Sequence, residues 1–509
     1  MLDSVCLTAG MSSLSARPPR SASFSRTAKL ANLKGTKRQV RQLPSRPARR
    51  ITLAATVAAL LALPAAAQRL PAQTPAAEPT PYQRAIAAGY KAAMYCSGIF
   101  SAGRTPEQID RNELTGIYPE YDKIVPMLTA SVDRRTATVT VAYDPAMPPR
   151  FAQWRAGTGC VTERIGATPP TAPVYPRGIK PGPGRGDRRP WPNGDRGIDP
   201  QPSPALAAAV GRALAEGYGE GTKSTGVVVL RDGAVVAERY AAGWGPFTSN
   251  RTWSAGKSLA GTLIGHVVQR PGPVPLRPST AALWQRAGDP REGVTLDHLL
   301  RMSSGLYSDT AGNRTDAIYF GGTAVEEQAL GWPLAAKPGT RFRYANNDTL
   351  LAVYTMRLAL GEDMNRLVPL AFLAKIGMAH TDLGVDWRGN YILSSQVWST
   401  ARDLARLGQL WLQDGVWQGE RLLPVGWMRY MTSPSGPQPA TGPGYGATLW
   451  LFGPKQGLPD GSYAAQGNRG QYVMVIPSAK LVIVRRGEDP GAARFDIARF
   501  AADVLAAVR

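Results

Sequence analysis

The chain has 509 residues, of which 43% are hydrophobic and 19% charged, so it has room for two or three globular domains. Its formal net charge of +22 is unusual for an enzyme. Eleven of the 59 basic residues, but only one of the 37 acidic residues, lie in residues 1–68. Much of the positive charge therefore belongs to one N-terminal segment, which argues against a nucleic-acid-binding protein.

Residues 1–68 have the pattern of a secretory leader. Arg49 and Arg50 precede the apolar run 51–63, and the small residues 65–68 follow it. This run of thirteen residues is too short for a helix that crosses a hydrocarbon core of about 30 Å. We expect a cleaved signal, with an uncleaved anchor as the alternative, and a soluble periplasmic or secreted mature protein without an integral membrane segment.

A linker (69–81) and a small accessory domain (82–165) follow the leader. A helix is predicted from residue 82 to 94, and alternating strands at 130–133 and 137–143. Cys96 and Cys160 are the two cysteines outside the leader. Export predicts a disulfide between them, and two buried free thiols are the alternative.

A Pro- and Gly-rich linker (166–204) leads into a domain that spans residues 205–509. Its first half predicts a helix at 203–216 and a hairpin of strands 227–230 and 234–237 around Asp232 and Gly233. Its last part predicts strands 472–476 and 481–484 and a helix at 490–508. The pattern indicates an α+β fold, in which both ends of the domain build one antiparallel sheet and a helical subdomain lies between them.

Ser254 and Lys257 form the first candidate catalytic motif. The sequence from Ser254 onward predicts a helix, and a spacing of three places both side chains on one face of its first turn. A serine hydroxyl needs a neighbouring base before it becomes a good nucleophile, and a lysine can supply one. The alternative is an N-cap serine with a surface lysine. The overlapping Gly256-Lys257-Ser258 is not a P-loop, because Arg251 stands where that motif requires glycine.

Tyr344 and Asn346 form the second candidate motif, after a Pro-Gly turn at 338–339. Ammonium groups nearby would lower the pKa of the Tyr344 phenol and let it act as a general base. The alternative is a half-buried structural tyrosine. The third motif, Asn468-Arg469-Gly470-Gln471, leads into strand 472–476, where backbone N–H groups could bind an oxyanion.

Taken together and in this order, the three motifs resemble the serine β-lactamase and penicillin-binding protein superfamily. More narrowly, they resemble its class C β-lactamase-like branch, which includes esterases and 6-aminohexanoate-dimer hydrolases. The resemblance covers roughly residues 205–509 and extends to three further stretches, 296–306, 399–408 and 444–446. It implies a β-lactamase-like fold for this domain.

The resemblance also implies roles for individual residues. Ser254 would be acylated, Lys257 would prepare the site, and Tyr344 would move protons to the leaving group and later activate water. Asn346 would hold the substrate or Lys257. The backbone N–H groups of Ser254 and Gln471 would bind the oxyanion.

The third motif departs from the Lys-Thr-Gly or His-x-Gly of antibiotic-recognising relatives. Arg469 could replace their cation only if its side chain turns inward, so we expect a neutral amide or ester substrate. The loop 307–322, beginning with Tyr307, is a further candidate for substrate binding. The alternatives are a penicillin-recognising β-lactamase or DD-peptidase, and an inactive envelope-binding protein. We expect no cofactor, no metal and no nucleic-acid partner, since the three histidines have no zinc-ligand spacing.

Overall fold

The computed structural model describes residues 78–172, 185–270, 280–307 and 315–508. The chain divides into two units, Met1–Pro75 and Ala76–Arg509, and every described residue belongs to the second. The predicted leader lies outside the described residues.

A seven-stranded antiparallel sheet contains strands from the beginning and the end of the predicted domain 205–509. The strand order is β12-β13-β14-β15-β16-β5-β6. Strand β16 pairs antiparallel with β5, for example Val484 with Val228, which confirms the predicted sheet built from both ends. The strands are β5 (Ser224–Arg231), β6 (Ala234–Tyr240), β12 (Gly444–Tyr445), β13 (Trp450–Phe452), β14 (Ser462–Gly467), β15 (Gln471–Ile476) and β16 (Leu481–Gly487).

The predicted hairpin at Asp232 and Gly233 connects β5 to β6. Both residues have positive φ angles, 50° and 83°, as a tight two-residue turn between twisted strands requires. A second hairpin connects β15 to β16. Its turn residue Lys480 also adopts a left-handed conformation, with φ 47°. Local turn chemistry therefore fixes two of the sheet's connections.

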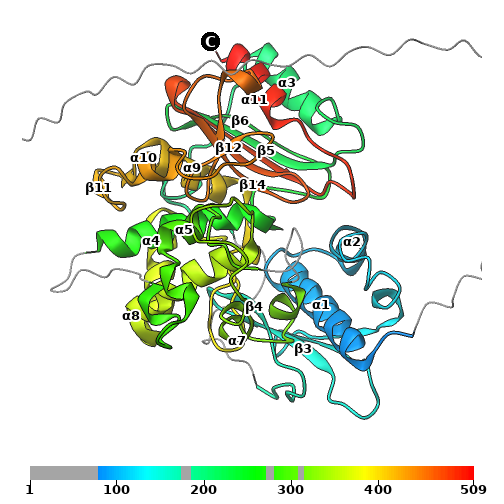
Figure 1. Cartoon of the computed structure of the whole chain (residues 1–509). Coiled ribbons are helices and arrows are strands. Elements are labelled where there is room, and N and C mark those ends of the chain that lie inside the picture. The colour runs from blue at the N-terminus through cyan, green and yellow to red at the C-terminus, as the bar shows by residue number, and fades with distance from the viewer. Residues whose placement is uncertain (1–77, 173–184, 271–279, 308–314, 509) are drawn as a thin grey trace, which may run out of the picture. The chain divides into compact units, whose positions relative to one another are not determined.

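Helices cover both faces of this sheet, which explains its nearly continuous apolar strands. Val227 and Val229 of β5 pack with the helices α3 (Pro204–Leu214) and α11 (Ile497–Ala507) (Figure 1). Val228 and Leu230 point to the opposite face, where α9 (Ala401–Leu412) contacts β5, β15 and β16. Thr400 caps α9, because its side chain accepts a hydrogen bond from the backbone N–H of Asp403.

The segment between the two halves of the sheet is mostly helical, which confirms the inserted helical subdomain. Helix α4 is buried over most of its length and packs against α8, whose helix is interrupted at Gly361. The helices are α4 (Gly256–Gln269), α5 (Leu296–Leu300), α6 (Asp316–Tyr319), α7 (Val325–Ala329), α8 (Asn346–Lys375) and α10 (Trp427–Thr432). The short strands are β7 (Asn250–Arg251), β8 (Asp382–Leu383), β9 (Val397–Ser399), β10 (Val416–Trp417) and β11 (Glu420–Arg421).

Residues 81–162 form a separate small sheet with its own helices. Helix α1 (Pro81–Phe100) is longer than the predicted 82–94 and is buried from Ala85 to Phe100. It packs on a four-stranded antiparallel sheet and on helix α2. These elements are α2 (Pro106–Glu113), β1 (Ala130–Asp133), β2 (Thr138–Val141), β3 (Arg150–Arg155) and β4 (Gly159–Thr162). The structure joins Cys96 of α1 to Cys160 of β4 by a disulfide.

Buried polar contacts connect this small sheet to the helical region. The guanidinium of Arg150, which is 1% exposed, donates to the carbonyl oxygens of Ala85 (2.8 Å), Glu163 (2.8 Å) and Phe320 (2.7 Å). The Tyr121 hydroxyl donates to the Asp316 carboxylate. The two parts therefore share buried hydrogen bonds, while the predicted domain boundaries remain predictions.

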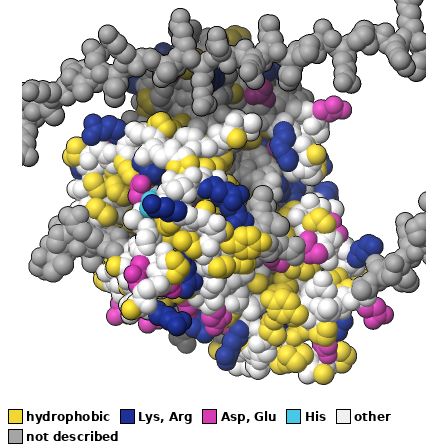
Figure 2. Space-filling model, in the orientation of Figure 1, with side chains coloured by type: hydrophobic (Ala, Val, Ile, Leu, Met, Phe, Trp, Pro, Cys, Tyr) yellow, Lys and Arg dark blue, Asp and Glu magenta, His cyan; other side chains and the backbone are white. Residues whose placement is uncertain are grey.

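Positively charged side chains are dispersed over the face of the described residues that is visible in Figure 2. Figure 2 shows the Lys and Arg side chains of that face in several separate groups among neutral and acidic ones. Among the described residues, no helix combines the length and the hydropathy that a membrane crossing requires.

The packing of α11 yields a stability prediction. Phe500 is fully buried between α11 and the sheet, so Phe500→Ala should lower the free energy of unfolding by about 3–5 kcal/mol. Ala506 lies on the exposed side of the same helix, and Ala506→Ser should change this free energy by less than about 0.5 kcal/mol. Urea denaturation of both variants measures the difference, and equal stabilities would contradict the assigned packing.

Candidate active site

Ser254 lies in a 3₁₀ turn, Trp253–Ala255, that connects β7 to α4. Trp253 has φ 51°, a conformation that is rare for a bulky residue and that must be held by its surroundings. The Arg251 guanidinium stacks on the Trp253 ring at 3.7 Å, and the Thr252 N–H donates to the Val397 carbonyl at 2.7 Å. This turn leaves the Ser254 side chain half-buried at the start of α4.

Lys257 is the second residue of α4, one turn after Ser254, and is 1% exposed, so the alternative of a surface lysine is wrong. Its Nζ has three oxygen neighbours. They are Ser254 Oγ at 3.1 Å, Asn346 Oδ1 at 2.6 Å and the Ser394 carbonyl oxygen at 2.8 Å. The Asn346 amide also donates to Thr315 Oγ1 at 3.1 Å, which orients its oxygen toward the lysine.

These contacts suit a lysine that is neutral. Burial lowers the pKa of Lys257 to about 7, because the charged form loses its hydration. A neutral amine has two N–H groups and one lone pair. The oxygens of Asn346 and Ser394 can only accept, so they take the two N–H groups, and the lone pair is left for the Ser254 hydroxyl. The arrangement is therefore that of a base poised to receive the serine proton.

Tyr344 completes the group around Ser254. Its hydroxyl is hydrogen-bonded to the Ser254 side chain, and the centre of its ring lies 5.1 Å from Lys257 Nζ. The ring packs against Trp450 and Tyr445, at centroid distances of 5.4 and 6.0 Å. The structure thus brings a hydroxyl, an amine and a phenol together across 90 residues of sequence.

The expected lowering of the Tyr344 pKa is wrong. Burial raises the pKa of Tyr344 above its ordinary value, and the hydrogen bond from Ser254 offsets this only in part. A largely neutral Lys257 supplies no strong positive charge that would favour the phenolate. At neutral pH the phenol is therefore protonated and can donate a proton rather than remove one.

An open cleft lies beside Ser254 and Tyr344 and along the end of β14. Its volume is about 270 Å³, close to the lower end of the range for small-molecule sites. Gly467, the last residue of β14, packs against the turn that carries Ser254. A Cβ at this position would lie 2.1 Å from the Thr252 carbonyl oxygen, so the close approach requires glycine. Residues that line the cleft include Ser254, Tyr344, Trp450, Gln466, Asn468 and Tyr472.

The four residues of the third motif differ in whether they face the cleft. Asn468 and Gly470 line the cleft beside Ser254. Arg469 also borders it, but its side chain is 7% exposed and its guanidinium binds the carbonyl oxygens of Asn112 and Glu488. Gln471 is 1% exposed and does not line the cleft, because its side-chain amide donates inward to the Arg469 and Gly487 carbonyls. The inward-facing cation that sequence reasoning left open is not present.

Tyr307 lies away from Ser254. It is 49% exposed, and its ring stacks with the Arg343 guanidinium at 5.5 Å. It lines a different cavity of about 240 Å³, together with Ser304 and Asp348. Sequence reasoning missed Ser394, Trp450 and Gln466. Ser394 acts through a backbone carbonyl, which no side-chain pattern can reveal.

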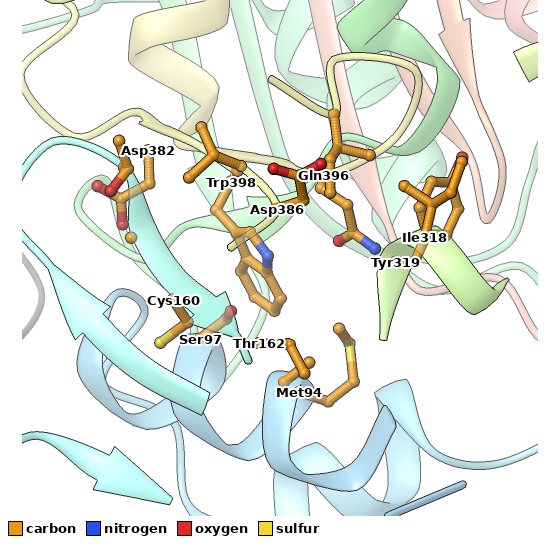
Figure 3. A pocket seen from close by; sticks show the side chains of 16 residues that line it. Met94, Ser97, Cys160, Thr162, Ile318, Tyr319, Asp382, Asp386, Gln396 and Trp398 are labelled. Carbon is orange, nitrogen blue, oxygen red and sulfur yellow. The ribbon is translucent and has the colours of Figure 1, made fainter. Parts of the chain in front are cut away.

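Figure 3 shows a smaller cavity between α1 and the segment 382–398. Its volume of about 20 Å³ holds roughly one water molecule, which excludes an organic substrate. Trp398, Asp382 and Thr162 are among its lining residues. The cleft at Ser254 is thus the candidate active site.

Comparison with known proteins decides the family. Residues 211–507, more than half of the chain, match the β-lactamase family. The chain belongs to the β-lactamase family. This assignment confirms the predicted superfamily, the β-lactamase-like fold and the class of protein, a hydrolase. The matched region contains Ser254, Lys257 and Tyr344 and excludes residues 82–165.

Individual members of the family are only distantly similar. The 6-aminohexanoate-dimer hydrolase of Paenarthrobacter ureafaciens is 24% identical over 304 residues, which cover 53% of this chain and 74% of the relative. A Bacillus anthracis protein provisionally named a 6-aminohexanoate-dimer hydrolase has a TM-score of 0.48 and 22% identity, over 58% of this chain and 80% of its own. A family VIII carboxylesterase has a TM-score of 0.47 and 15% identity, over 61% and 98%.

The pKa of Lys257 predicts how the reactivity of Ser254 depends on pH. Because this pKa is lowered to about 7, the neutral amine is scarce below pH 7 and predominates above it. The rate at which a fluorophosphonate labels Ser254 should therefore rise about tenfold per pH unit below 7 and level off above it. Lys257→Arg, whose guanidinium stays protonated, should lose labelling between pH 5 and 9. A rise centred above pH 9 in the unmodified protein would contradict the assignment.

Proposed function

We propose that the protein is a serine hydrolase that cleaves an amide or ester bond through an acyl-enzyme on Ser254. The observation that carries the proposal is the buried Lys257 amine, whose Nζ lies 3.1 Å from Ser254 Oγ and contacts the oxygens of Asn346 and Ser394. Membership of the β-lactamase family supports it. Ser254, Lys257 and Tyr344 are the proposed catalytic residues, and Asn346 orients the lysine.

In the acylation step, Lys257 Nζ takes the Ser254 proton as Oγ attacks the substrate carbonyl carbon. The carbonyl oxygen gains the negative charge that preorganised N–H groups can stabilise. We assign these donors to the backbone N–H groups of Ser254 and Asn468, because Gly467 packs directly on the serine turn and Asn468 follows it into the cleft. Asn468 thereby replaces the predicted donor Gln471, which lies outside the cleft.

In the second half of acylation, Tyr344 gives its proton to the leaving nitrogen or oxygen and is reprotonated from the Lys257 ammonium. The acyl-enzyme and the free amine or alcohol remain. Water then attacks the ester carbonyl and gives its proton to the neutral Lys257 amine, and Ser254 Oγ leaves with a proton from the resulting Lys257 ammonium. Each half-reaction returns the lysine to its neutral state.

The proposed substrate has a neutral amide or ester at the reacting bond, and the cleft that receives it is also lined by Asp489 and Arg494. The Arg469 guanidinium is already bound to two carbonyl oxygens and does not meet the substrate carboxylate that a β-lactam would present. Trp450 and Tyr472 provide aromatic walls suited to an aliphatic or aromatic chain. The relative from Paenarthrobacter ureafaciens is named for a linear amide dimer, which belongs to the same chemical class.

Export is part of the proposal. The leader-like residues 1–68 and the Cys96–Cys160 disulfide both suit an oxidising compartment, so we assign the mature protein to the periplasm or the medium.

Substitution of Ser254 and of Tyr344 tests the chemistry. Ser254→Ala should abolish fluorophosphonate labelling and turnover, because no other group replaces the nucleophile. Tyr344→Phe should lower kcat by about 10²–10⁴-fold, because the leaving group loses its proton donor. A screen of short acyl esters, linear amides and nitrocefin, each followed spectroscopically, provides the rates.

Circular dichroism should show that both variants remain folded. Labelling that persists in Ser254→Ala would refute the acyl-enzyme, and an unlabelled wild type would favour an inactive binding protein of this fold. Turnover of nitrocefin above that of esters and amides would favour a penicillin-recognising enzyme instead.

Export predicts a shortened chain with no free thiol. Expression of the whole sequence in a bacterium should yield a periplasmic protein whose N-terminus lies within residues 65–69. Because Cys6 is removed with the leader, iodoacetamide should modify no cysteine before reduction and two, Cys96 and Cys160, after it. Mass spectrometry measures both. An intact leader or two free thiols in the native protein would contradict this assignment.

A further inference from the structure

The turn Asn468–Gly470 shapes the cleft, yet its own backbone does not favour the conformation it adopts. Arg469 has φ 57° and Gly470 has φ 76°, and the left-handed region is unfavourable for arginine. A Cβ on Gly470 would lie 1.6 Å from Arg485 Nη1, so the turn is pressed against a buried guanidinium. Contacts outside the turn must therefore hold it in place beside Ser254.

The side chain of Arg469 makes contacts that hold the turn in place. Its Nη1 donates to the carbonyl oxygen of Asn112, at the end of α2, and its Nη2 donates to the Glu488 carbonyl at 3.1 Å. Its Nε lies 3.4 Å from the Glu488 carboxylate. Arg469 thus connects the cleft turn to the chain that follows β16 and to the N-terminal segment.

Glu488 connects the same anchor to the nucleophile. Its Oε1 accepts a hydrogen bond from Asn250 Nδ2 at 2.8 Å, and Asn250 lies in β7, four residues before Ser254. Arg104 of the N-terminal segment lies 3.8 Å from the Glu488 carboxylate and 2.7 Å from that of Glu113. The Glu488 carboxylate therefore contacts Asn250 of β7, Arg469 of the turn at the cleft, and Arg104 in the segment before α2.

The four charged side chains of this cluster are Arg104, Arg469, Glu113 and Glu488, and each is at most 7% exposed. Burial and the neighbouring Glu113 raise the pKa of Glu488 to about 7, and the positive charges of Arg104 and Arg469 offset this in part. Neither Arg104 nor Glu113 lines the cleft. The cluster is thus positioned to fix geometry at the active site without meeting substrate.

We propose that Arg469 and Glu488 are positioning residues which hold the Asn468 N–H in line with Ser254, and that Arg104 and the Asn112 carbonyl make residues 82–113 part of the active-site support. The proposal rests on the proposed function, because it concerns the oxyanion donors of that site. It assigns the N-terminal segment, which lies outside the region matched by the family, a role in the reaction.

The expected kinetic signature follows from this role. A donor that shifts by a fraction of an ångström stabilises the transition state less but leaves the bound substrate almost unaffected. Arg469→Met and Arg104→Met should each lower kcat about 10- to 100-fold and change KM less than about twofold. The affinity for a boronic acid, which mimics the tetrahedral state on Ser254, should fall in parallel with kcat/KM.

The matched control is Arg402→Met. Arg402 forms a similarly buried ion pair with Glu238, at 2.7 Å, but does not line the cleft. Its removal should lower the melting temperature and leave kcat and boronate affinity unchanged below the unfolding transition. Arg469→Lys keeps the charge but cannot bind both carbonyl oxygens with one ammonium, so it should fold and still lose kcat, by several-fold.

The failures of the two proposals are distinguishable. A wild-type protein that neither reacts with fluorophosphonate nor binds the boronate would refute the proposed function. A wild-type protein that does both, with wild-type kcat and boronate affinity in folded Arg469→Lys and Arg104→Met, would overturn the positioning role alone. A loss of stability in these variants without a change in either constant would also overturn it.

Discussion

The site depends on a single buried amine. Lys257 loses its hydration in the core, and the oxygens of Asn346 and Ser394 bind its two N–H groups, so its lone pair is directed at Ser254. Burial lowers the pKa of Lys257 to about 7, whereas it raises the pKa of Tyr344. The same low-dielectric surroundings therefore separate the two roles: the amine becomes a base at neutral pH and the phenol remains an acid.

The fold supports this amine from three directions. Helix α4 carries Lys257 and begins at the serine turn, helix α8 begins with Asn346, and β14 ends at Gly467, where only glycine permits contact with that turn. The Arg469–Glu488 anchor adds the segment before and within α2 to this support. Residues from four distant parts of the chain thus support one site.

The sequence predicted the features that depend on local pattern. The Asp232-Gly233 turn and the apolar strands of the sheet depend on a few neighbouring residues, and the Ser254–Lys257 spacing places both side chains on one helical face. Features that depend on residues far apart in the sequence were not predicted. The sequence indicated Arg469 as a candidate substrate ligand. Its actual partners, Asn112 and Glu488, lie 357 and 19 residues away in the sequence, so no local pattern could reveal them. The direction of the Tyr344 pKa shift depended on burial, which no motif records.

The protonation state of Lys257 is the central claim, and nuclear magnetic resonance tests it most directly. In protein labelled at lysine ¹³Cε and ¹⁵Nζ, the Lys257 signal is identified as the one lost in Lys257→Arg. We predict a titration midpoint near pH 7, far below that of an exposed lysine. A midpoint above pH 9 would mean a permanent ammonium at this position and would contradict the account.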